Sequence, residues 1–197
     1  MADSLAPDVV RPLLSGRFGH VYRYEELLES TQRLLRPDDP EGAVAVAEEQ
    51  SEGRGRLDRR WHAPARTSVL VSMLLRPAVE SPRLPELSLV TGGAVAEAIA
   101  EVTGLEPAIK FPNDVLLGGK KVAGILAESS EGRVVLGIGV NANQTADQLP
   151  TDAQTEPTSL RLELGEPVDR AELLAAILRH VERAYDAWIV TGTSASG

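Results

Sequence analysis

One short segment concentrates positive charge and glycine in a chain that is acidic overall. Residues 50–61 read QSEGRGRLDRRW, so four arginines fall within positions 54–60. Glycine lets a backbone approach an anion closely, and arginine offers a planar fork of donors that matches phosphate or carboxylate oxygens. The spacing fits neither a Walker A loop nor the dinucleotide fingerprint, which Asp58 interrupts. The segment predicts an anion-binding loop, with a solvated basic loop as the structural alternative.

The segment KFPND, residues 110–114, places a single lysine in an otherwise apolar strand. An ammonium group is costly to bury without a counter-charge. Lys110 therefore either reaches solvent from the strand end or serves as a point charge for a bound carboxylate or phosphate. Pro112 favours an extended Phe111. Asn113 and Asp114 follow at the expected turn, where such residues are more often turn formers than catalysts.

A third segment, GIGVN over residues 137–141, alternates glycine with large apolar residues. Residues two apart on a strand share a face, so Gly137, Gly139 and Asn141 lie on one face and the apolar side chains on the other. Two positions without side chains that lead to an amide predict a slot for a flat ligand, whose polar edge the amide would read. Gly124 opens the neighbouring strand in the same way. Glycines that mark β-bulges are the structural alternative.

The pattern around these segments predicts a mixed α/β domain with strands clustered after one long helix. Residues 1–16 predict an irregular lead-in, and Gly118-Gly119 predicts a two-residue hairpin turn. Alternating or continuous apolar runs predict strands over residues 42–50, 69–75, 109–111, 115–117, 121–128 and 133–141.

Two helices are expected to cover the sheet. The first spans residues 84–102 and ends at Gly104, a typical residue after a helix C-terminus. The second spans 169–190, begins at Asp169 with Glu172 in a capping-box pattern, and is followed by a frayed tail over 191–197. Its apolar stripe consists of Leu174, Leu178, Val181, Tyr185 and Trp188.

Composition narrows the possible partners and chemistry. The chain has 197 residues, with 20 basic and 29 acidic side chains, a net charge of −9 and a pI near 4.9, which argues against nucleic acid as the main partner. The absence of cysteine excludes disulfides, thiolate metal sites and a cysteine nucleophile. No metal site is predicted, because the three histidines are far apart: His20, His62 and His180. Without a signal sequence or a long apolar run, we expect a soluble, cytoplasmic protein that does not bind membranes.

In combination, these segments resemble the catalytic domain of biotin protein ligases, the biotin–[acetyl-CoA-carboxylase] ligases. Any one motif could arise by chance, but five in family order between about Tyr22 and Trp188 are specific. The motifs are Ser30-Thr31, Gln50 followed by GRGR, Arg59 and Trp61, KFPND at 110–114, KVAGIL at 121–126 and GIGVN at 137–141. The resemblance implies an α/β (α+β) fold over residues 17–190: a mixed β-sheet flanked by helices, like class II aminoacyl-tRNA synthetases and the biotin/lipoate ligases.

The resemblance also implies a two-step, ATP-dependent reaction. Biotin and ATP, the latter with Mg²⁺, would give biotinyl-5′-AMP and diphosphate. The biotinyl group would then pass to a lysine on the biotin carboxyl carrier domain of acetyl-CoA carboxylase or a related carboxylase. Both steps build charge at one phosphorus or one carbonyl group, and fixed cations lower such barriers. No protein nucleophile is required.

Roles for individual residues follow from the same resemblance. Lys110, Arg54 and Arg56 are the implied catalytic residues, and the GRGR loop would fold over the adenylate. Trp61 would pack near the adenine, and Asn141 would bond its edge. The implied biotin-binding residues are Ser30, Thr31, Gln50, Gly53, Arg54, Lys110, Gly124 and Gly137. The implied nucleotide-binding residues are Arg56, Arg59, Trp61, Asn113, Lys121 and Asn141.

Three features depart from the family pattern. Phe111 stands where the family usually has tryptophan, and Leu57-Asp58 makes the loop less basic than usual. The family's C-terminal SH3-like barrel, which helps close the ATP side and receive the carrier, has no counterpart in this sequence. The DNA-binding domain of the ligase-repressors is also missing, so the chain resembles the ligase-only class.

Two alternatives stay open. A lipoate ligase or octanoyl transferase of the same fold would be expected to lack the GRGR loop, and the octanoyl transferases use a cysteine that this chain does not have. A non-catalytic or truncated module that binds biotin or biotinyl-AMP would keep Ser30, Thr31 and Gln50 but lose turnover.

Overall fold

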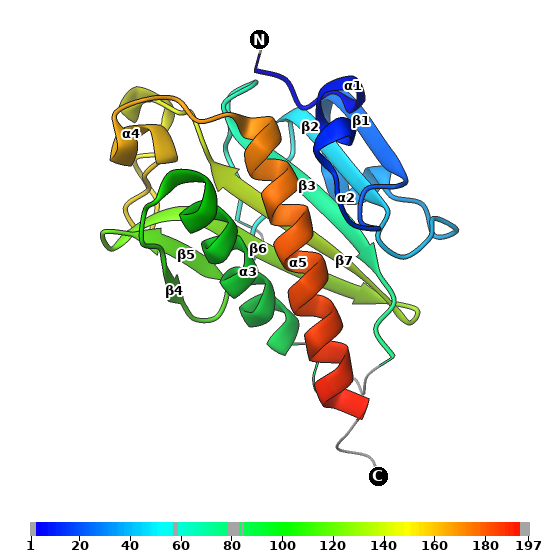
Figure 1. The fold of residues 1–197 in the computed structure, drawn as a ribbon. Coiled ribbons are helices and arrows are strands. Elements are labelled where there is room, and N and C mark those ends of the chain that lie inside the picture. The colour runs from blue at the N-terminus through cyan, green and yellow to red at the C-terminus, as the bar shows by residue number, and fades with distance from the viewer. Residues whose placement is uncertain (1–2, 57–58, 79–82, 84, 194–197) are drawn as a thin grey trace.

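The computed structural model describes residues 3–56, 59–78, 83 and 85–193. Its centre is a seven-stranded sheet in the order β1-β2-β3-β7-β6-β5-β4 (Figure 1). β1 runs parallel to β2, and the other described pairings are antiparallel. The strands are β1 (Tyr22–Leu28), β2 (Val44–Gln50), β3 (Ser68–Leu75), β4 (Ala108–Lys110), β5 (Asp114–Leu117), β6 (Lys120–Ser130) and β7 (Arg133–Asn141).

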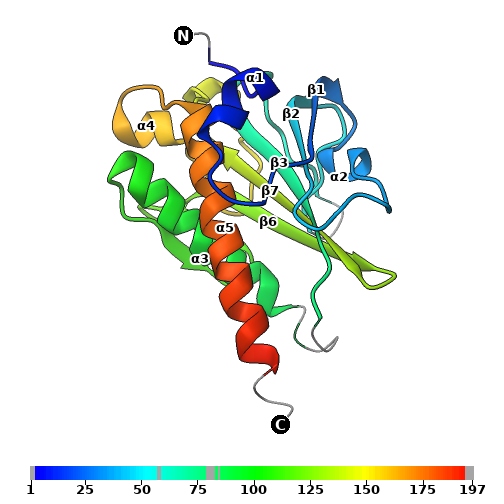
Figure 2. The ribbon, with the colours of Figure 1, turned by 45° about the vertical axis from the view of Figure 1, so that its right-hand side comes forward.

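Two long helices, α3 (Glu86–Thr103) and α5 (Arg170–Thr193), lie side by side across one face of the sheet (Figures 1 and 2). All five residues of the predicted apolar stripe on α5 are buried. The strands contribute alternate side chains to the core beneath the helices, among them Val69, Val71, Met73, Leu136, Ile138 and Val140. The intervening residues of β3 and β7 therefore point to the opposite face.

Turn and cap residues act as their types predict. Gly104 ends α3 with a positive φ of 72°, and Gly118 and Gly119 turn the β5–β6 hairpin with φ of 55° and 84°. Oδ1 of Asp169 accepts hydrogen bonds from the backbone N–H groups of Ala171 and Glu172, at 2.9 and 3.1 Å, and so caps α5.

Several predicted boundaries were wrong. α5 continues to Thr193, so residues 191–193 belong to the helix, while 194–197 lie outside the described residues. α3 begins at Glu86, and the predicted start at Leu84 is also outside them. The lead-in is not irregular: α1 (Pro7–Val10) and a 3₁₀ turn (Arg11–Leu13) form there. Pro7 presets the first helical φ, and Leu5 and Val10 are fully buried, so tertiary packing orders this segment.

Three elements of the fold, β1 and the short helices α2 (Thr31–Leu34) and α4 (Leu160–Leu164), were not predicted from the sequence. β1 is an edge strand whose residues Arg23, Glu25 and Glu26 hide the alternation that marks a half-buried strand. Because β1, β2 and β3 all precede α3, the prediction that the strands cluster after the long helix was wrong. The helices α2 and α4 have too few turns to show a helical period.

Candidate functional site

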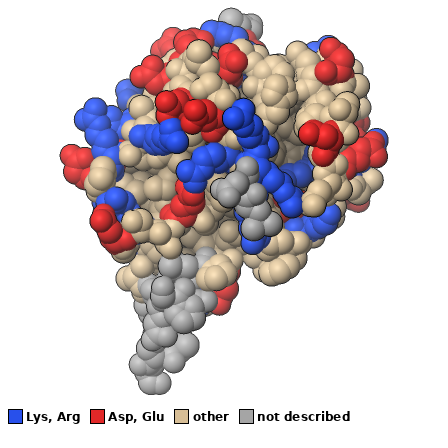
Figure 3. Space-filling view, turned by 180° about the vertical axis from the view of Figure 1, so that it is seen from behind, with Lys and Arg blue, Asp and Glu red and all other residues tan. Residues whose placement is uncertain are grey.

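A cavity of about 780 Å³ opens on the face of the sheet that α3 and α5 leave uncovered. Leu70 of β3 and Gly137 and Gly139 of β7 line it, and these residues alternate with those that enter the helix-side core. Seen from this side, Lys and Arg side chains gather around the hollow (Figure 3). The sequence motifs, which lie far apart along the chain, therefore meet at one site.

With the exception of Gly53, every residue predicted for the site lines this cavity. Gly53 instead lies within the basic loop, where its backbone contacts the backbone of Trp61. Its carbonyl oxygen accepts a 2.8 Å hydrogen bond from the Trp61 N–H, and a Cβ at this position would lie 2.4 Å from the Trp61 carbonyl oxygen. The glycine is required because two backbone segments touch there.

One end of the cavity is a buried polar cluster. Ser30 and Thr31, at the start of α2, are each 4% exposed. Oε1 of Gln50 accepts hydrogen bonds from the backbone N–H of Thr31 at 2.7 Å and from its hydroxyl at 3.1 Å. With its oxygen occupied in this way, the Gln50 amide has only N–H donors left for a ligand. This end therefore suits a ligand group that accepts hydrogen bonds.

The glycines of β6 and β7 do form a slot, but a side chain of the chain itself lies in it. A Cβ on Gly139 would come 2.6 Å from Cε2 of Trp61, and one on Gly124 would come 3.0 Å from Cζ3. The β6–β7 register is regular through Gly124↔Gly139 and Leu126↔Gly137, so the alternative of bulge glycines was wrong. Gly124 and Gly139 are glycine because the Trp61 indole lies on the sheet there, whereas a Cβ on Gly137 would meet Nε2 of Gln32 at 3.1 Å.

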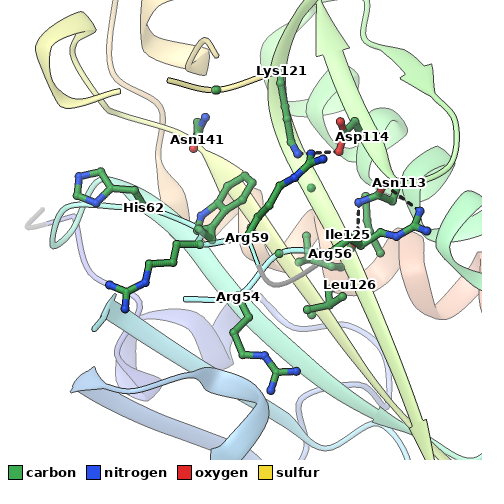
Figure 4. Close-up of a pocket in the computed structure, with 18 of the residues that line it drawn as sticks. Arg54, Arg56, Arg59, His62, Asn113, Asp114, Lys121, Ile125, Leu126 and Asn141 are labelled. Carbon is green, nitrogen blue, oxygen red and sulfur yellow. Dashed lines mark hydrogen bonds and ion pairs between the residues drawn. The ribbon is translucent and has the colours of Figure 1, made fainter. Parts of the chain in front are cut away.

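Two lysines approach the cavity in different ways. Nζ of Lys121 lies 2.7 Å from Oδ1 of Asp114 and 5.6 Å from the centre of the Trp61 ring. Figure 4 shows this lysine and carboxylate pointing toward one another. Lys110 is exposed, and its Nζ donates a 2.8 Å hydrogen bond to Oγ1 of Thr155. The interior cation is therefore Lys121, whereas Lys110 lies at the rim.

The basic loop is tightly turned, and its arginines diverge. The Gly55 N–H donates a hydrogen bond to the Arg59 carbonyl at 2.7 Å. Leu57 and Asp58, which the sequence places in this loop, lie outside the described residues. Arg56 reaches across to Oδ1 of Asn113 at 3.4 Å (Figure 4). Arg54 forms an ion pair with Glu128 on β6.

A wall of the cavity that no sequence motif indicated comes from residues 150–157, which follow β7. Its composition is that of an ordinary loop, so the sequence offered no signal. Two backbone hydrogen bonds of Lys121 hold this wall in place. The Lys121 N–H donates to the Glu156 carbonyl at 2.7 Å, and the Lys121 carbonyl accepts from the Thr158 N–H at 2.8 Å. The backbone of Lys121 on β6 therefore positions this wall, and the side chain of the same residue lies in the cavity.

Asn141 lines the cavity, but its amide already has partners within the protein. Its Nδ2 donates to the Thr158 carbonyl at 2.9 Å, and its Oδ1 accepts from Nε2 of Gln144 at 3.0 Å. The residue is 5% exposed. Asn141 therefore connects the end of β7 to the loop that returns beside Lys121, in addition to whatever it offers a ligand.

Comparison with known proteins identifies the family. Residues 24–144 match the Biotin/lipoate A/B protein ligase family. The chain belongs to this family. Its members include biotin protein ligases that retain the same sheet: the enzyme from Aquifex aeolicus in complex with biotin and ATP superimposes with a TM-score of 0.77 at 33% identity, over 85% of this chain and 71% of that one.

Relatives within the biotin/lipoate ligase family are longer than this chain. The bifunctional ligase/repressor BirA of Bacillus subtilis is 38% identical over 178 residues, which are 86% of this chain and 55% of that protein. The biotin–[acetyl-CoA-carboxylase] ligase of Mycobacterium tuberculosis is 40% identical over 156 residues, or 76% and 56%. The chain thus spans about half the length of these curated relatives.

Among the described residues, no group of three or more His, Asp or Glu side chains is arranged to hold a metal ion. Within the same residues, no helix combines the length and apolar character needed to cross a membrane.

Proposed function

We propose that this protein is an ATP-dependent biotin protein ligase. In the first step, a carboxylate oxygen of biotin would attack the α-phosphorus of ATP, giving biotinyl-5′-AMP and releasing diphosphate. In the second, a lysine amine of a biotin carboxyl carrier domain would attack the biotinyl carbonyl and release AMP.

The observation that carries this proposal is the order of groups along the cavity. A buried polar end, formed by Thr31 and Gln50, is followed by the glycines of the sheet and then by Lys121, with Asn141 and the 150–157 wall beyond. A ligand with a polar head, an apolar body and a carboxylate fits the first part. The carboxylate would meet the nucleotide beside the lysine.

In this arrangement Lys121 stabilises the charge that develops where the carboxylate and the α-phosphate react. Asp114 holds the ammonium group in place through the 2.7 Å ion pair. Lys110, together with Arg54 and Arg56, lies where it would contact the phosphates or cover the intermediate from the rim. The proposed biotin contacts that line the cavity are Ser30, Thr31, Gln50, Arg54, Lys110, Gly124 and Gly137, with Gly53 in the adjoining loop. The proposed nucleotide contacts are Arg56, Arg59, Trp61, Asn113, Lys121 and Asn141.

Magnesium would accompany ATP. Mg²⁺ usually binds through one or two carboxylates together with substrate phosphates, and not in a closed protein cage. The acidic side chains that line the cavity, Asp114 and Asp152, are consistent with that mode. The ion would neutralise phosphate charge, while the protein's own cations act at the reacting atoms.

The family also contains lipoate-type acyl ligases, which are the second candidate function. The polar end formed by Gln50 and Thr31 favours biotin, because a lipoyl or octanoyl chain has no hydrogen-bonding group at that end. The proposed partners are therefore biotin, ATP and a carboxyl carrier domain, with neither nucleic acid nor membrane. A cytoplasmic location is part of the same proposal.

The test is to incubate the purified chain with biotin, ATP, Mg²⁺ and a carrier domain, and to measure the mass of the carrier. We expect a gain of one biotinyl group that disappears when the acceptor lysine is replaced by arginine. Lipoate in place of biotin is the competing substrate. Diphosphate release without carrier labelling would indicate a module that forms and holds the adenylate. If the folded chain neither releases diphosphate nor labels the carrier, the proposal is refuted.

A further inference from the structure

Strand β3 contains two serines that the motifs did not indicate. Ser68 and Ser72 are both 0% exposed, and they flank Leu70, which lines the cavity. All three share the face opposite to Val69 and Val71, which enter the helix-side core. A hydroxyl buried on an apolar strand is costly unless it has a hydrogen-bond partner. Each serine has one: Ser72 pairs with Thr31, which lines the cavity, and Ser68 pairs with Gln144, which in turn bonds Asn141 of the lining.

Ser72 supports the polar end. Its Oγ lies 2.7 Å from Oγ1 of Thr31. Since the Thr31 hydroxyl gives its only proton to Oε1 of Gln50, Ser72 is the donor in this pair. The chain of hydrogen bonds runs from Ser72 through Thr31 to Gln50, and it turns the amide of Gln50 so that its N–H donors face the cavity.

Ser68 supports the other end. Its Oγ accepts a 2.6 Å hydrogen bond from Nε2 of Gln144, a residue that is 0% exposed. The same Nε2 donates to Oδ1 of Asn141, whose Nδ2 holds the Thr158 carbonyl beside Lys121. This second chain of bonds fixes the orientation of the Asn141 amide and the position of Thr158, the residue directly after the 150–157 wall.

We propose that Ser68 and Ser72 are positioning residues that set the two halves of the site independently. Ser72 orients the groups that bind biotin, and Ser68 orients the groups that bind the nucleotide. Neither serine lines the cavity itself. Strand spacing places their Cα atoms roughly 13 Å apart, so loss of one hydroxyl leaves the other chain of bonds intact. This assignment of the two ends rests on the proposed function.

Single substitutions test the separation. Ser72→Ala should weaken biotin binding, measured by calorimetry without ATP, and leave the KM for ATP unchanged. Ser68→Ala should raise the KM for ATP in a diphosphate-release assay at saturating biotin, and leave biotin affinity unchanged. Losing one supporting hydrogen bond should change each constant by roughly three- to tenfold. Ser129→Ala, at an exposed position on β6, is the matched control and should change neither constant.

The pattern of outcomes is decisive. If both variants change both constants together, or if neither changes any, the serines are merely structural and the inference is wrong. Where an alanine variant does not fold, Ser72→Cys supplies a weaker donor and Ser68→Cys a weaker acceptor at nearly the same volume, and each should show the same split. A wild-type chain that neither binds biotin nor releases diphosphate would instead refute the proposed function. A wild-type chain that does both, without the split, would refute only the inference.

Discussion

The indole of Trp61 lies on the backbone of Gly139, so closely that a Cβ on the glycine would be 2.6 Å from Cε2 of the ring. Trp61 belongs to the basic loop, whereas Gly139 belongs to β7, near the middle of the sheet. The Trp61 ring therefore packs the basic loop against the sheet, and this contact is possible because residue 139 has no side chain.

Replacing Gly139 by alanine should expel the ring. A contact below 3.0 Å cannot be tolerated, and the opposing group is a large ring packed against Gly124 and Lys121. We expect the fluorescence of Trp61 to shift to the red, because the indole becomes solvated, while the buried Trp188 contributes an unchanged signal. Gly93→Ala on α3 is the control, since its Cβ would meet only Ile109 Cδ1 at 3.8 Å. Unchanged emission from the Gly139 variant would contradict the packing.

The two lysines should differ in their contribution to adenylation. Lys121→Ala removes the cation held by Asp114 inside the cavity, and such losses cost on the order of 10²–10³ in rate. Lys110→Ala removes an exposed group bonded to Thr155, so diphosphate release should fall less. Circular dichroism checks that both variants fold. A greater loss for Lys110 would restore that residue, which the sequence motif favoured, as the principal catalytic cation.

Arg56→Gly should release the intermediate early. Its guanidinium lies 3.4 Å from Oδ1 of Asn113 and, in the proposed lid, would also bond the adenylate; a charge-assisted hydrogen bond to such an anion contributes roughly 1.5–3 kcal/mol. At about 1.4 kcal/mol per factor of ten, biotinyl-AMP should escape about ten to a hundred times more readily. The measurement is biotin labelling of added serum albumin beside the carrier domain. Wild-type selectivity in the variant would mean that the loop is not a lid.

Glu48→Gln should strongly destabilise the fold. Arg170 is 0% exposed and donates to Glu48, itself 1% exposed, at 2.7 Å. Because Arg170 keeps a second, partly exposed carboxylate partner, Asp3 at 2.8 Å, we expect a cost of about 3 kcal/mol, the low end for breaking a buried ion pair. Urea unfolding measures the loss. The exposed pair of Glu29 and Arg33 provides the comparison, because Glu29→Gln should cost at most about 1 kcal/mol. Similar losses in both variants would contradict the role of burial.

The α3–α5 contact should weaken in acid. His180 on α5 bonds Glu97 and Glu101 on α3, at 3.0 and 2.8 Å, and these bonds are the main reason that the pKa of each carboxyl is lowered. Arg179 and Arg183, also on α5, act in the same direction. A lowered pKa in the folded state means stabilisation that is present above the ordinary value of 4.5 and lost as the pH falls through the folded value.

Replacing His180 by glutamine tests this dependence. The free energy of unfolding should drop in the variant at pH 6 and converge with that of the wild type as the pH falls through the lowered pKa values of Glu97 and Glu101, because the two carboxylates then become protonated. His20→Gln, at an exposed position, should leave the profile unchanged. Parallel pH profiles for wild type and the His180 variant would show that the cluster does not contribute.

What the sequence by itself determined was local. Turn glycines at 104 and 118–119, the cap at Asp169 and the stripe on α5 depend on neighbouring residues, so pattern and residue type were sufficient to predict them. The alternation of GIGVN likewise placed its glycines on one face, where they line the cavity. Such features require only the period of a strand or helix and the φ that a turn demands.

Tertiary structure decided which groups meet. Strand register and the irregularity at Val115/Leu116 place Lys121 against Asp114 inside the cavity and leave Lys110 at the rim, although both lysines occupy motifs. The slot predicted for a flat ligand holds Trp61, because the loop folds back onto the sheet. Ser68 and Ser72 gained their partners from segments distant in sequence. Contacts of this kind depend on how distant strands and loops pack, and periodicity along one strand carries no information about them.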